Sequence, residues 1–450
     1  MKQQKIIAGF PNQNAAMKKF KVLLAGVFIS SIGSGLTDFG LAIYILNRTG
    51  SVSATGVFAV CAFLPAILLA PVGGVLADRY DRRLMMILGE LFSGLALLIC
   101  LVAVMSSHPS LVAICVGAGI SSVFSALTEP AFKATITDLL SAADFARAGG
   151  MVQLASSAKL LIAPAVAGLL LQVTPVSSLI ILDMLTFFTT VLIIAFVRKG
   201  LVSRKRAVAN LDFISEMSDG ITAIRSKKGI MTMIAIMTIT TFCLGFVQML
   251  SKPLVLAIAG ERELGILTTV IAMGMMAGSL IISIIKHPKS YVQMLSLGLL
   301  GCGVFFALIG ISENLVLIAG FGFMMFAFMP AIQIGAEVLI RTNLDNTVQG
   351  RAFGLIGLIT QMGYILAFIA AGILSDLIFE PFMLGSSKLA IQIGEIIGYG
   401  VGRGNALLII ITGIGLLVAG IVTARLKSVR TLEKKETTHE TFTKSYSKGL

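Results

Sequence analysis

The stretch GVLADRYDRR, residues 74–83, separates two long apolar runs at residues 53–76 and 84–106. Each run has the length of about 20 residues that an α-helix needs to cross the hydrocarbon core of a bilayer. The stretch between them carries three arginines and two aspartates, which are costly to place in hydrocarbon. This part of the sequence therefore predicts two membrane-spanning helices joined by a short charged loop.

The same pattern continues through the chain of 450 residues. Apolar residues make up 56% of it and charged residues 13%, whereas an ordinary globular domain is about 25% charged. The sequence therefore predicts an all-α membrane protein with twelve transmembrane helices. The predicted spans are 22–46, 53–76, 84–106, 110–132, 150–172, 177–197, 230–258, 263–285, 290–311, 314–337, 352–379 and 405–424.

Polar segments divide these spans into two sets of six. We expect a cytoplasmic N-terminus at 1–21, a six-helix bundle at 22–197 and a cytoplasmic linker at 198–229. A second six-helix bundle follows at 230–426, and a polar cytoplasmic tail at 427–450. The first apolar run is longer than the core of a signal peptide, so we interpret it as a retained helix.

The distribution of basic residues predicts the orientation. With the N-terminus inside, 29 of the 35 lysines and arginines fall on the cytoplasmic side and only five near the outer side. Such a bias orients membrane helices, and a shift of the topology by one span would invert it. The net charge of +13 is thus explained without nucleic acid. We expect a multi-pass protein of the plasma or inner membrane with both termini in the cytoplasm.

Several chemistries lack their sequence signatures. The chain has no G-x-x-x-x-G-K-[ST] motif, its three histidines lie in loops or the tail, and its five cysteines lie inside apolar runs without metal spacing. We therefore expect no cofactor, no metal site, no disulfide framework and no enzymatic activity.

Ionisable residues inside spans require a partner or a function. Asp38 lies in the first span and Lys159 near the middle of the fifth. The two could form an ion pair, either a proton-labile one exchanged during transport or a static one. Glu129 could relay protons, or could simply pair with Lys133 one turn later. Gln361 could hydrogen-bond a substrate or join two helices.

Residues 74–83 resemble the signature loop of the major facilitator superfamily, G-x-x-x-D-R-x-G-R-R, with Asp81 in place of the second glycine. RAGG at 147–150 and RAFG at 351–354 occupy equivalent places in the two halves, as expected of two six-helix pseudo-repeats. The resemblance implies a conformational lock that braces the second span against the eleventh. The residues assigned to this conformational lock are Gly74, Asp78, Arg79, Arg82 and Arg83. Among them, Gly74 is expected to allow close approach of two helices.

The resemblance also bears on the residues inside the spans. In this superfamily the first span lines the central cavity, which favours a proton-binding role for Asp38. The third and sixth spans are peripheral, so Glu90 and Asp183 are expected to be packing residues. The fifth span keeps Gly150, Pro164 and Gly168 of an antiporter signature, G-x8-G-x3-G-P-x2-G-G, in which Lys159 replaces a glycine. A proline-kinked helix without that function is the alternative.

Two further stretches are similar to the macrolide-efflux branch of the superfamily: GRAFG at 350–354, and the segment containing EPFM at 380–383 and GYGVGRG at 398–404. For the glycine-rich run the simpler interpretation is a flexible outer loop.

These resemblances imply a secondary active exporter that moves a small amphipathic compound, drug-like or macrolide-like, by alternating access in exchange for protons or Na⁺. The alternatives are an exporter of a siderophore or other metabolite, a lysolipid flippase, and, from another class, a membrane enzyme or a sensor. The expected partners are the substrate, the coupling ion and the lipid bilayer, and we expect a monomer.

Overall fold

The structure of the chain is a computed structural model that describes residues 13–140, 144–198, 221–222, 224–225, 227–284, 290–344 and 349–433. Within its helices a few side chains lie outside the description, those of Asp78 and Arg351 among them. Most of the predicted linker and tail, together with residues 1–12, also lie outside it.

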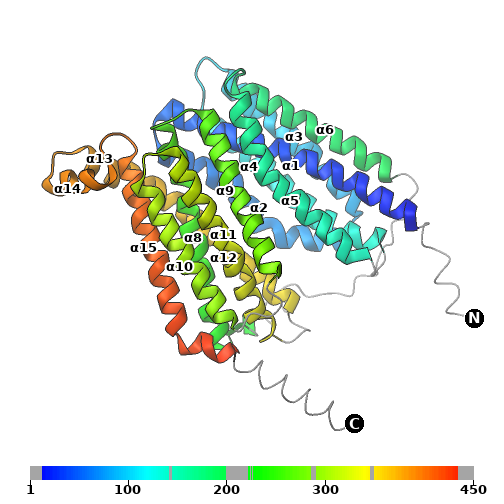
Figure 1. Cartoon of the computed structure of the whole chain (residues 1–450). Coiled ribbons are helices and arrows are strands. Elements are labelled where there is room, and N and C mark those ends of the chain that lie inside the picture. Colours follow the sequence, from blue (N-terminus) through cyan, green and yellow to red (C-terminus); the bar gives the residue numbers. More distant parts are fainter. Residues whose placement is uncertain are drawn as a thin grey trace, which may run out of the picture. The chain divides into compact units, whose positions relative to one another are not determined.

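The described chain folds into helices, as predicted, and these fall into two sets of six long ones (Figure 1). The first set comprises α1 (Gln13–Thr49), α2 (Val52–Arg79), α3 (Arg82–Met105), α4 (Leu111–Leu139), α5 (Phe145–Leu170) and α6 (Val176–Arg198). The second comprises α8 (Lys228–Leu256), α9 (Glu261–Ile284), α10 (Tyr291–Ile311), α11 (Leu315–Arg341), α12 (Gln349–Leu374) and α15 (Arg403–Arg425).

Eleven of the described helices are long and apolar enough to cross a membrane, and the remaining long helix, α5, has its apolar part at Lys159–Leu170. Together they account for the twelve predicted spans. Helix starts follow local capping: the side chains of Asp81, Ser110 and Asn314 accept hydrogen bonds from amides in the first turns of α3, α4 and α11.

The chain divides into two compact units, described separately here: residues 1–44 with 61–209, and residues 45–60 with 210–450. The end of α1 and the start of α2 therefore belong to the second unit, which the predicted boundaries do not show. The reason is close packing, since a Cβ added at Gly56 would lie 2.5 Å from the carbonyl oxygen of Phe368, and one at Gly372 would lie 2.6 Å from Ser53 Cα.

Small residues allow the spans to approach one another. Gly26, Gly33 and Gly40 follow a seven-residue spacing along α1, and all three face side chains of α6. In the second unit, Gly274 and Gly278 of α9 form a G-x-x-x-G pair whose added Cβ atoms would collide with backbone carbonyls of α11. Inside a bilayer such contacts stabilise helix pairs through dispersion and not through the hydrophobic effect, so small residues at the contact matter most.

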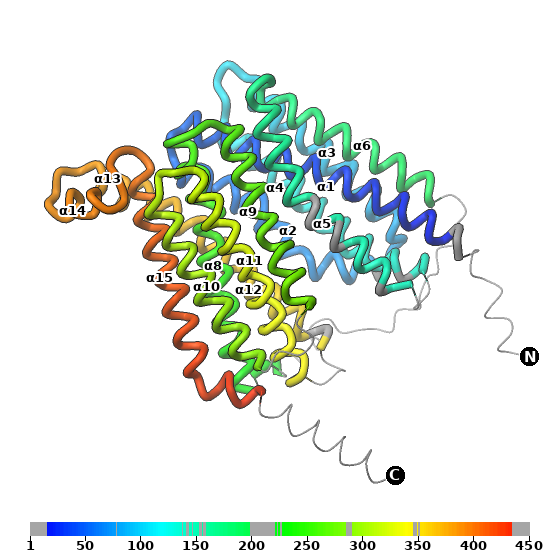
Figure 2. The backbone as a smooth tube through the Cα atoms, in the orientation of Figure 1, coloured from blue at the N-terminus to red at the C-terminus, as the bar shows by residue number. Residues whose placement is uncertain are grey.

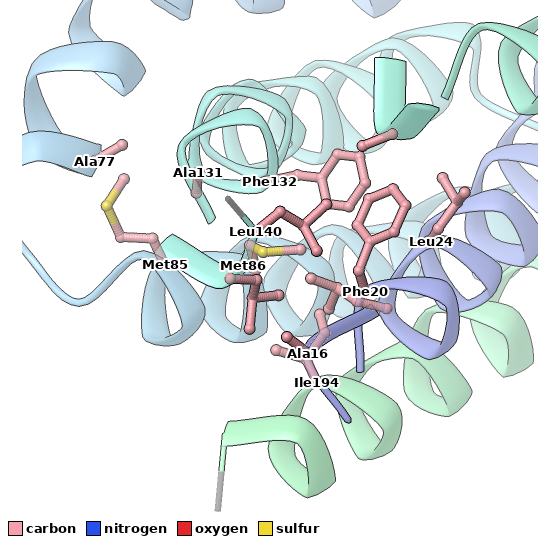
Figure 3. Close-up of a cluster of buried hydrophobic side chains, with 13 residues drawn as sticks. Ala16, Phe20, Leu24, Ala77, Met85, Met86, Ala131, Phe132, Leu140 and Ile194 are labelled. Carbon is pink, nitrogen blue, oxygen red and sulfur yellow. The ribbon is translucent and has the colours of Figure 1, made fainter. Parts of the chain in front are cut away.

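A cluster of buried apolar side chains closes one end of the first unit. Figure 3 shows Phe20 of α1, Met86 of α3, Phe132 of α4 and Ile194 of α6 meeting there. All four are at most 3% exposed. The cluster ties four helices together beside the loop at residues 74–83.

The smooth trace in Figure 2 shows the long helices of the second unit running alongside one another, with a small projection near the start of α15. The predicted span 352–379 continues without a break through η3 (Ser375–Phe379) and α13 (Glu380–Leu384). Helix α14 (Lys388–Ile397) precedes the glycine-rich run and is not among the predicted elements. Gly398, Gly400 and Gly402 then turn the chain with positive φ angles, a conformation that favours glycine.

Candidate functional site

The first unit contains a group of ionisable side chains inside its spanning helices. Helix α1 contributes Asp38, α3 contributes Glu90, α5 contributes Lys159 and α6 contributes Asp183. Asp38, Glu90 and Lys159 all lie close enough to Asp183 to act on it electrostatically. We call these four residues the acidic cluster.

A polar stripe along α1 faces this cluster. Ser30, Gly33, Ser34 and Thr37 follow the i, i+3, i+4, i+7 spacing that places residues on one face of a helix. Ser30 and Thr37 are almost fully buried. The stripe replaces the apolar contacts of an ordinary span with small groups and hydroxyls.

Glu90 binds to this stripe directly. Its side chain is 4% exposed, and its carboxylate accepts a hydrogen bond of 2.6 Å from the Ser30 hydroxyl. Within the part of the chain that the structure describes, Ser30 is its only hydrogen-bond partner. No ion pair with a described residue neutralises it, so Glu90 is a buried carboxyl held by one neutral hydroxyl.

Asp183 is buried even more deeply, with 1% of its surface exposed. The Ser34 hydroxyl lies 3.4 Å from its Oδ1 atom. Gly33 makes room for it, because a Cβ there would lie 2.7 Å from Oδ1. The buried Thr37 hydroxyl also lies beside Asp183 and interacts with its carboxyl. The surroundings of Asp183 thus contain hydroxyls from two positions of α1.

Lys159 packs against α1 at Gly35. A Cβ added to Gly35 would lie 3.5 Å from Lys159 Cε and 2.6 Å from the Cβ of Ala163. Asp38 follows Gly35 by three residues, so it lies on the same side of α1 one turn further along. The long lysine side chain, which reaches the level of Gly35, therefore brings its amine toward Asp38.

Two of the predicted cavity residues, Glu129 and Gln361, are not part of the acidic cluster of the first unit. Glu129 on α4 is exposed and forms an ion pair of 2.7 Å with Lys133, the local pairing that its i+4 spacing predicts. Gln361 on α12 belongs to the second unit and is exposed in the isolated chain. Their predicted transport roles stay predictions.

The packing role of Glu90 and Asp183 stays a prediction, and the structure places both of them in the acidic cluster beside α1. A peripheral position was expected for their spans, and that expectation gave no reason to connect them with α1. The sequence feature that could have indicated this connection is the helical spacing of hydroxyl residues between positions 30 and 37.

The loop at residues 74–83 is organised by charge. The Arg82 guanidinium donates to the carbonyl oxygens of Ala77 and Ala134 and pairs with Asp138 at 2.9 Å, so it joins the ends of α2 and α4. Asp81, at the place of the missing glycine, caps α3 and pairs with Arg198 of α6 at 3.0 Å. Arg83 is buried and Arg79 is exposed. The side chain of Asp78 lies outside the described residues.

The close-approach role predicted for Gly74 belongs instead to its neighbour. No described atom lies within 4 Å of a Cβ added at Gly74. A Cβ at Gly73 would lie 2.6 Å from the carbonyl oxygen of Ala126 on α4. From the sequence alone, either glycine could make a close helix contact. The packing of α2 against α4 shows that Gly73 makes it within the first unit.

The antiporter-like residues all lie on α5. Pro164 is within the helix, Gly168 is buried, and no described atom lies within 4 Å of a Cβ added at Gly150. The contact between α5 and α1 is made instead by Ala163 and Lys159, two positions where the signature has glycine.

The described ranges contain no group of residues arranged for metal binding or thiol chemistry. No group of three or more His, Cys, Asp or Glu side chains there could hold a metal ion. The five cysteines are free thiols, four of them buried as small apolar groups.

The family model of the Major Facilitator Superfamily matches residues 23–257, more than half of the chain. The chain belongs to the Major Facilitator Superfamily. Macrolide efflux protein A of Streptococcus pyogenes is 24% identical over 369 residues, covering 80% of this chain and 89% of that protein. The uncharacterized MFS-type transporter YfiS of Bacillus subtilis is 25% identical over 382 residues, covering 82% and 88%.

Solved transporters share the fold of this superfamily member. A bacterial homologue of the human lysosomal transporter Spinster superposes with a TM-score of 0.71 at 12% identity, covering 94% of this chain and 99% of that one. The nucleoside transporter NupG gives 0.70 at 14% identity, covering 91% and 100%. At these identities the likeness concerns the fold alone. The superfamily and the twelve long helices establish a multi-pass membrane transporter.

Proposed function

We propose that this transporter exports a small amphipathic compound of the macrolide type in exchange for protons, and that the acidic cluster couples the two movements. The observation that carries the proposal is the placement of three carboxyls and one amine among spanning helices, with Glu90 and Asp183 almost fully buried. The similarity to macrolide efflux protein A over 80% of the chain supports the substrate class.

The coupling argument follows from the charges. A single lysine can neutralise only one carboxylate of the cluster. A further buried carboxyl costs least when it binds a proton or a small cation, because an ionised group without a partner is strongly disfavoured in hydrocarbon. Glu90 and Asp183 are held by the hydroxyls of Ser30 and Ser34, which can donate to a carboxylate or accept from a carboxylic acid. The site therefore suits a group that gains and loses a proton during transport.

The cycle that we propose uses Lys159 as the internal cation. With the cavity empty, Lys159 neutralises Asp38. Binding of substrate displaces this pairing. A proton from the outside then binds the freed Asp38 carboxylate as the substrate leaves, and release of that proton to the cytoplasm restores the pair with Lys159, so that the inward movement of protons drives the outward movement of substrate. The loop around Arg82 and Asp81 lies on the cytoplasmic side in this scheme, as the distribution of basic residues predicts.

Accumulation of a macrolide in cells tests the proposal. Cells expressing the chain should accumulate less macrolide than cells with an empty vector, and a protonophore should abolish the difference. Ethidium, an amphipathic cation, would serve as a second test compound. Equal accumulation with and without the chain, at verified membrane expression, would rule out export of these compounds. Persistent efflux in the presence of the protonophore would rule out proton coupling.

A further inference from the structure

Helices α13 and α14 form a separate feature of the second unit. They connect the end of the span made by α12 and η3 to the start of α15, and in Figure 1 they project sideways from that end of α15. Both neighbours are spanning helices, so α14 starts and ends close to one surface of the membrane. Transport as proposed above makes no use of this projection.

The projection is fixed to α15 by polar contacts. The Glu380 carboxylate accepts hydrogen bonds from the amides of Gly402 and Asn405, at 3.2 and 3.1 Å, and from the Asn405 side chain at 2.7 Å. It thus serves as an N-terminal cap for α15, whose own cap residue, Gly402, has no side chain to do so.

A buried arginine holds the other end. Arg403 is 1% exposed, and its guanidinium donates to the carbonyl oxygen of Ile397 at 2.9 Å and pairs with Glu313 at 3.5 Å. The last carbonyls of α14 therefore have a cation beside them, which stabilises a helix C-terminus. Contacts at the start of α13 and at the end of α14 thus fix the projection against α15.

Three rows of residues run along α14, each with the i, i+4, i+7 spacing of one helix face. The first row is buried against the rest of the unit, the second is polar, and the third is apolar. In that order the rows are Ala390, Gly394 and Ile397; Lys388, Gln392 and Glu395; and Leu389, Ile393 and Ile396.

The apolar row is open to the surroundings of the chain. Leu389 is 64% exposed and Ile396 70%. Leu384, at the end of the preceding helix, is also 59% exposed. On a different side of α14, Tyr399 packs on Gly394 and its hydroxyl donates to the carbonyl oxygen of Ile391, which is 46% exposed.

We propose that α14 is an interfacial helix that binds the lipid surface, with its apolar row among the upper acyl chains and its polar row toward water and headgroups. A short helix with separate apolar and polar faces, tied to the ends of two spans, has the form of such elements.

Lipid fits this surface better than a second protein. Stable protein interfaces bury about 800 Å² on each partner, far more than one row of three side chains on a ten-residue helix can supply. Lipid needs no matching partner surface and covers whatever apolar area the membrane depth allows. In the orientation proposed above the lipid is that of the outer leaflet.

The chain contains no tryptophan, so a single introduced one reports on its position alone. We would place it in the apolar row as Ile396→Trp and Leu389→Trp, and in the polar row as the matched control Gln392→Trp. Each full-length variant is reconstituted into phosphatidylcholine vesicles, with and without brominated acyl chains, and its fluorescence is also titrated with aqueous acrylamide.

The proposal predicts blue-shifted emission from Ile396→Trp and Leu389→Trp, and quenching by brominated lipid at least about twofold stronger than for Gln392→Trp, which acrylamide should quench more. Equal lipid quenching of all three would overturn it. So would protection of Ile396→Trp from acrylamide without quenching by brominated lipid, because another protein surface would then cover the helix. These outcomes do not depend on what is transported, so they remain separable from the test of export.

Discussion

The carboxylate of Asp376 lies 2.8 Å from the amide nitrogen of Ser53, at the first turn of a helix 323 residues earlier in the chain. The same carboxylate accepts hydrogen bonds from the Ser51 hydroxyl at 2.7 Å and the Val52 amide at 3.0 Å. A side chain from η3 thus caps the N-terminus of α2, where amides lack partners and a negative charge is favoured.

Removal of this cap should destabilise the chain. We expect Asp376→Ala to cost about 1 kcal/mol, the usual effect of losing an N-cap side chain, and to lower the apparent melting temperature by about 2 °C. The free cysteines provide the measurement, since a thiol-reactive fluorophore reacts with the buried ones as the chain unfolds. Glu395→Ala, on the exposed polar row of α14, is the control. Equal melting temperatures for the two variants would mean that water replaces the cap without loss.

Neighbouring glycines at the end of α2 should respond differently to the same change. We expect Gly73→Ala to cost about 1–3 kcal/mol, because its Cβ would lie 2.6 Å from the Ala126 carbonyl oxygen and force α2 and α4 apart. Gly74→Ala should leave stability unchanged or slightly higher, since its Cβ meets open space and alanine favours the helix. Thermal unfolding of the two variants decides the assignment, and the reverse order would return the packing role to Gly74.

The buried carboxyl of Glu90 should be needed for coupled efflux. We expect Glu90→Gln to reduce macrolide efflux at least about tenfold, because the amide keeps the shape and the contact with Ser30 but cannot release a proton. Glu395→Gln, at an exposed carboxyl on α14 outside the acidic cluster, should stay near the wild-type rate. Matched expression of both variants is verified in isolated membranes. Normal efflux by Glu90→Gln would remove this carboxyl from the mechanism.

Lys159 and Asp38 should behave as a charge pair. Lys159→Met alone should lower the melting temperature, because it leaves the carboxylates of the cluster without their cation. The cost should stay below the roughly 3–5 kcal/mol of a fully buried pair, because Lys159 and Asp38 are half-buried. The double variant Lys159→Met with Asp38→Asn should recover part of that loss while remaining inactive in coupled efflux. A double variant that is as unstable as the two single losses combined would show that the two charges do not interact.

The sequence predicts the spans well because hydropathy over about 20 residues is a property of each segment by itself. Contacts between segments cannot be predicted in this way. Glu90 and Ser30 are 60 residues apart, and Asp376 and Ser51 are 325 apart. The periodicity of α1 marks the face that carries Ser30 and Ser34, but which of the other helices packs on that face is decided by the whole bundle.

The segment before α15 shows a second limit. Residues 388–397 are too short for a span, and helix α14 was not predicted there. Arg403 and Glu380 hold this segment against α15 through contacts that become visible only when the chain is folded. Asp81 is a similar case. The signature loop has glycine at this position, and the reason for an aspartate becomes visible only in its ion pair with Arg198.

Substrate-driven proton movement in vesicles tests the central claim most directly. The purified chain is reconstituted with a pH-sensitive dye inside, a macrolide is added outside, and the change in internal pH is compared for the wild type and Asp183→Asn. The proposed mechanism predicts a macrolide-dependent proton flux with the wild type and none with Asp183→Asn at equal protein content. The same flux from both proteins would contradict the assignment of ion coupling to the acidic cluster.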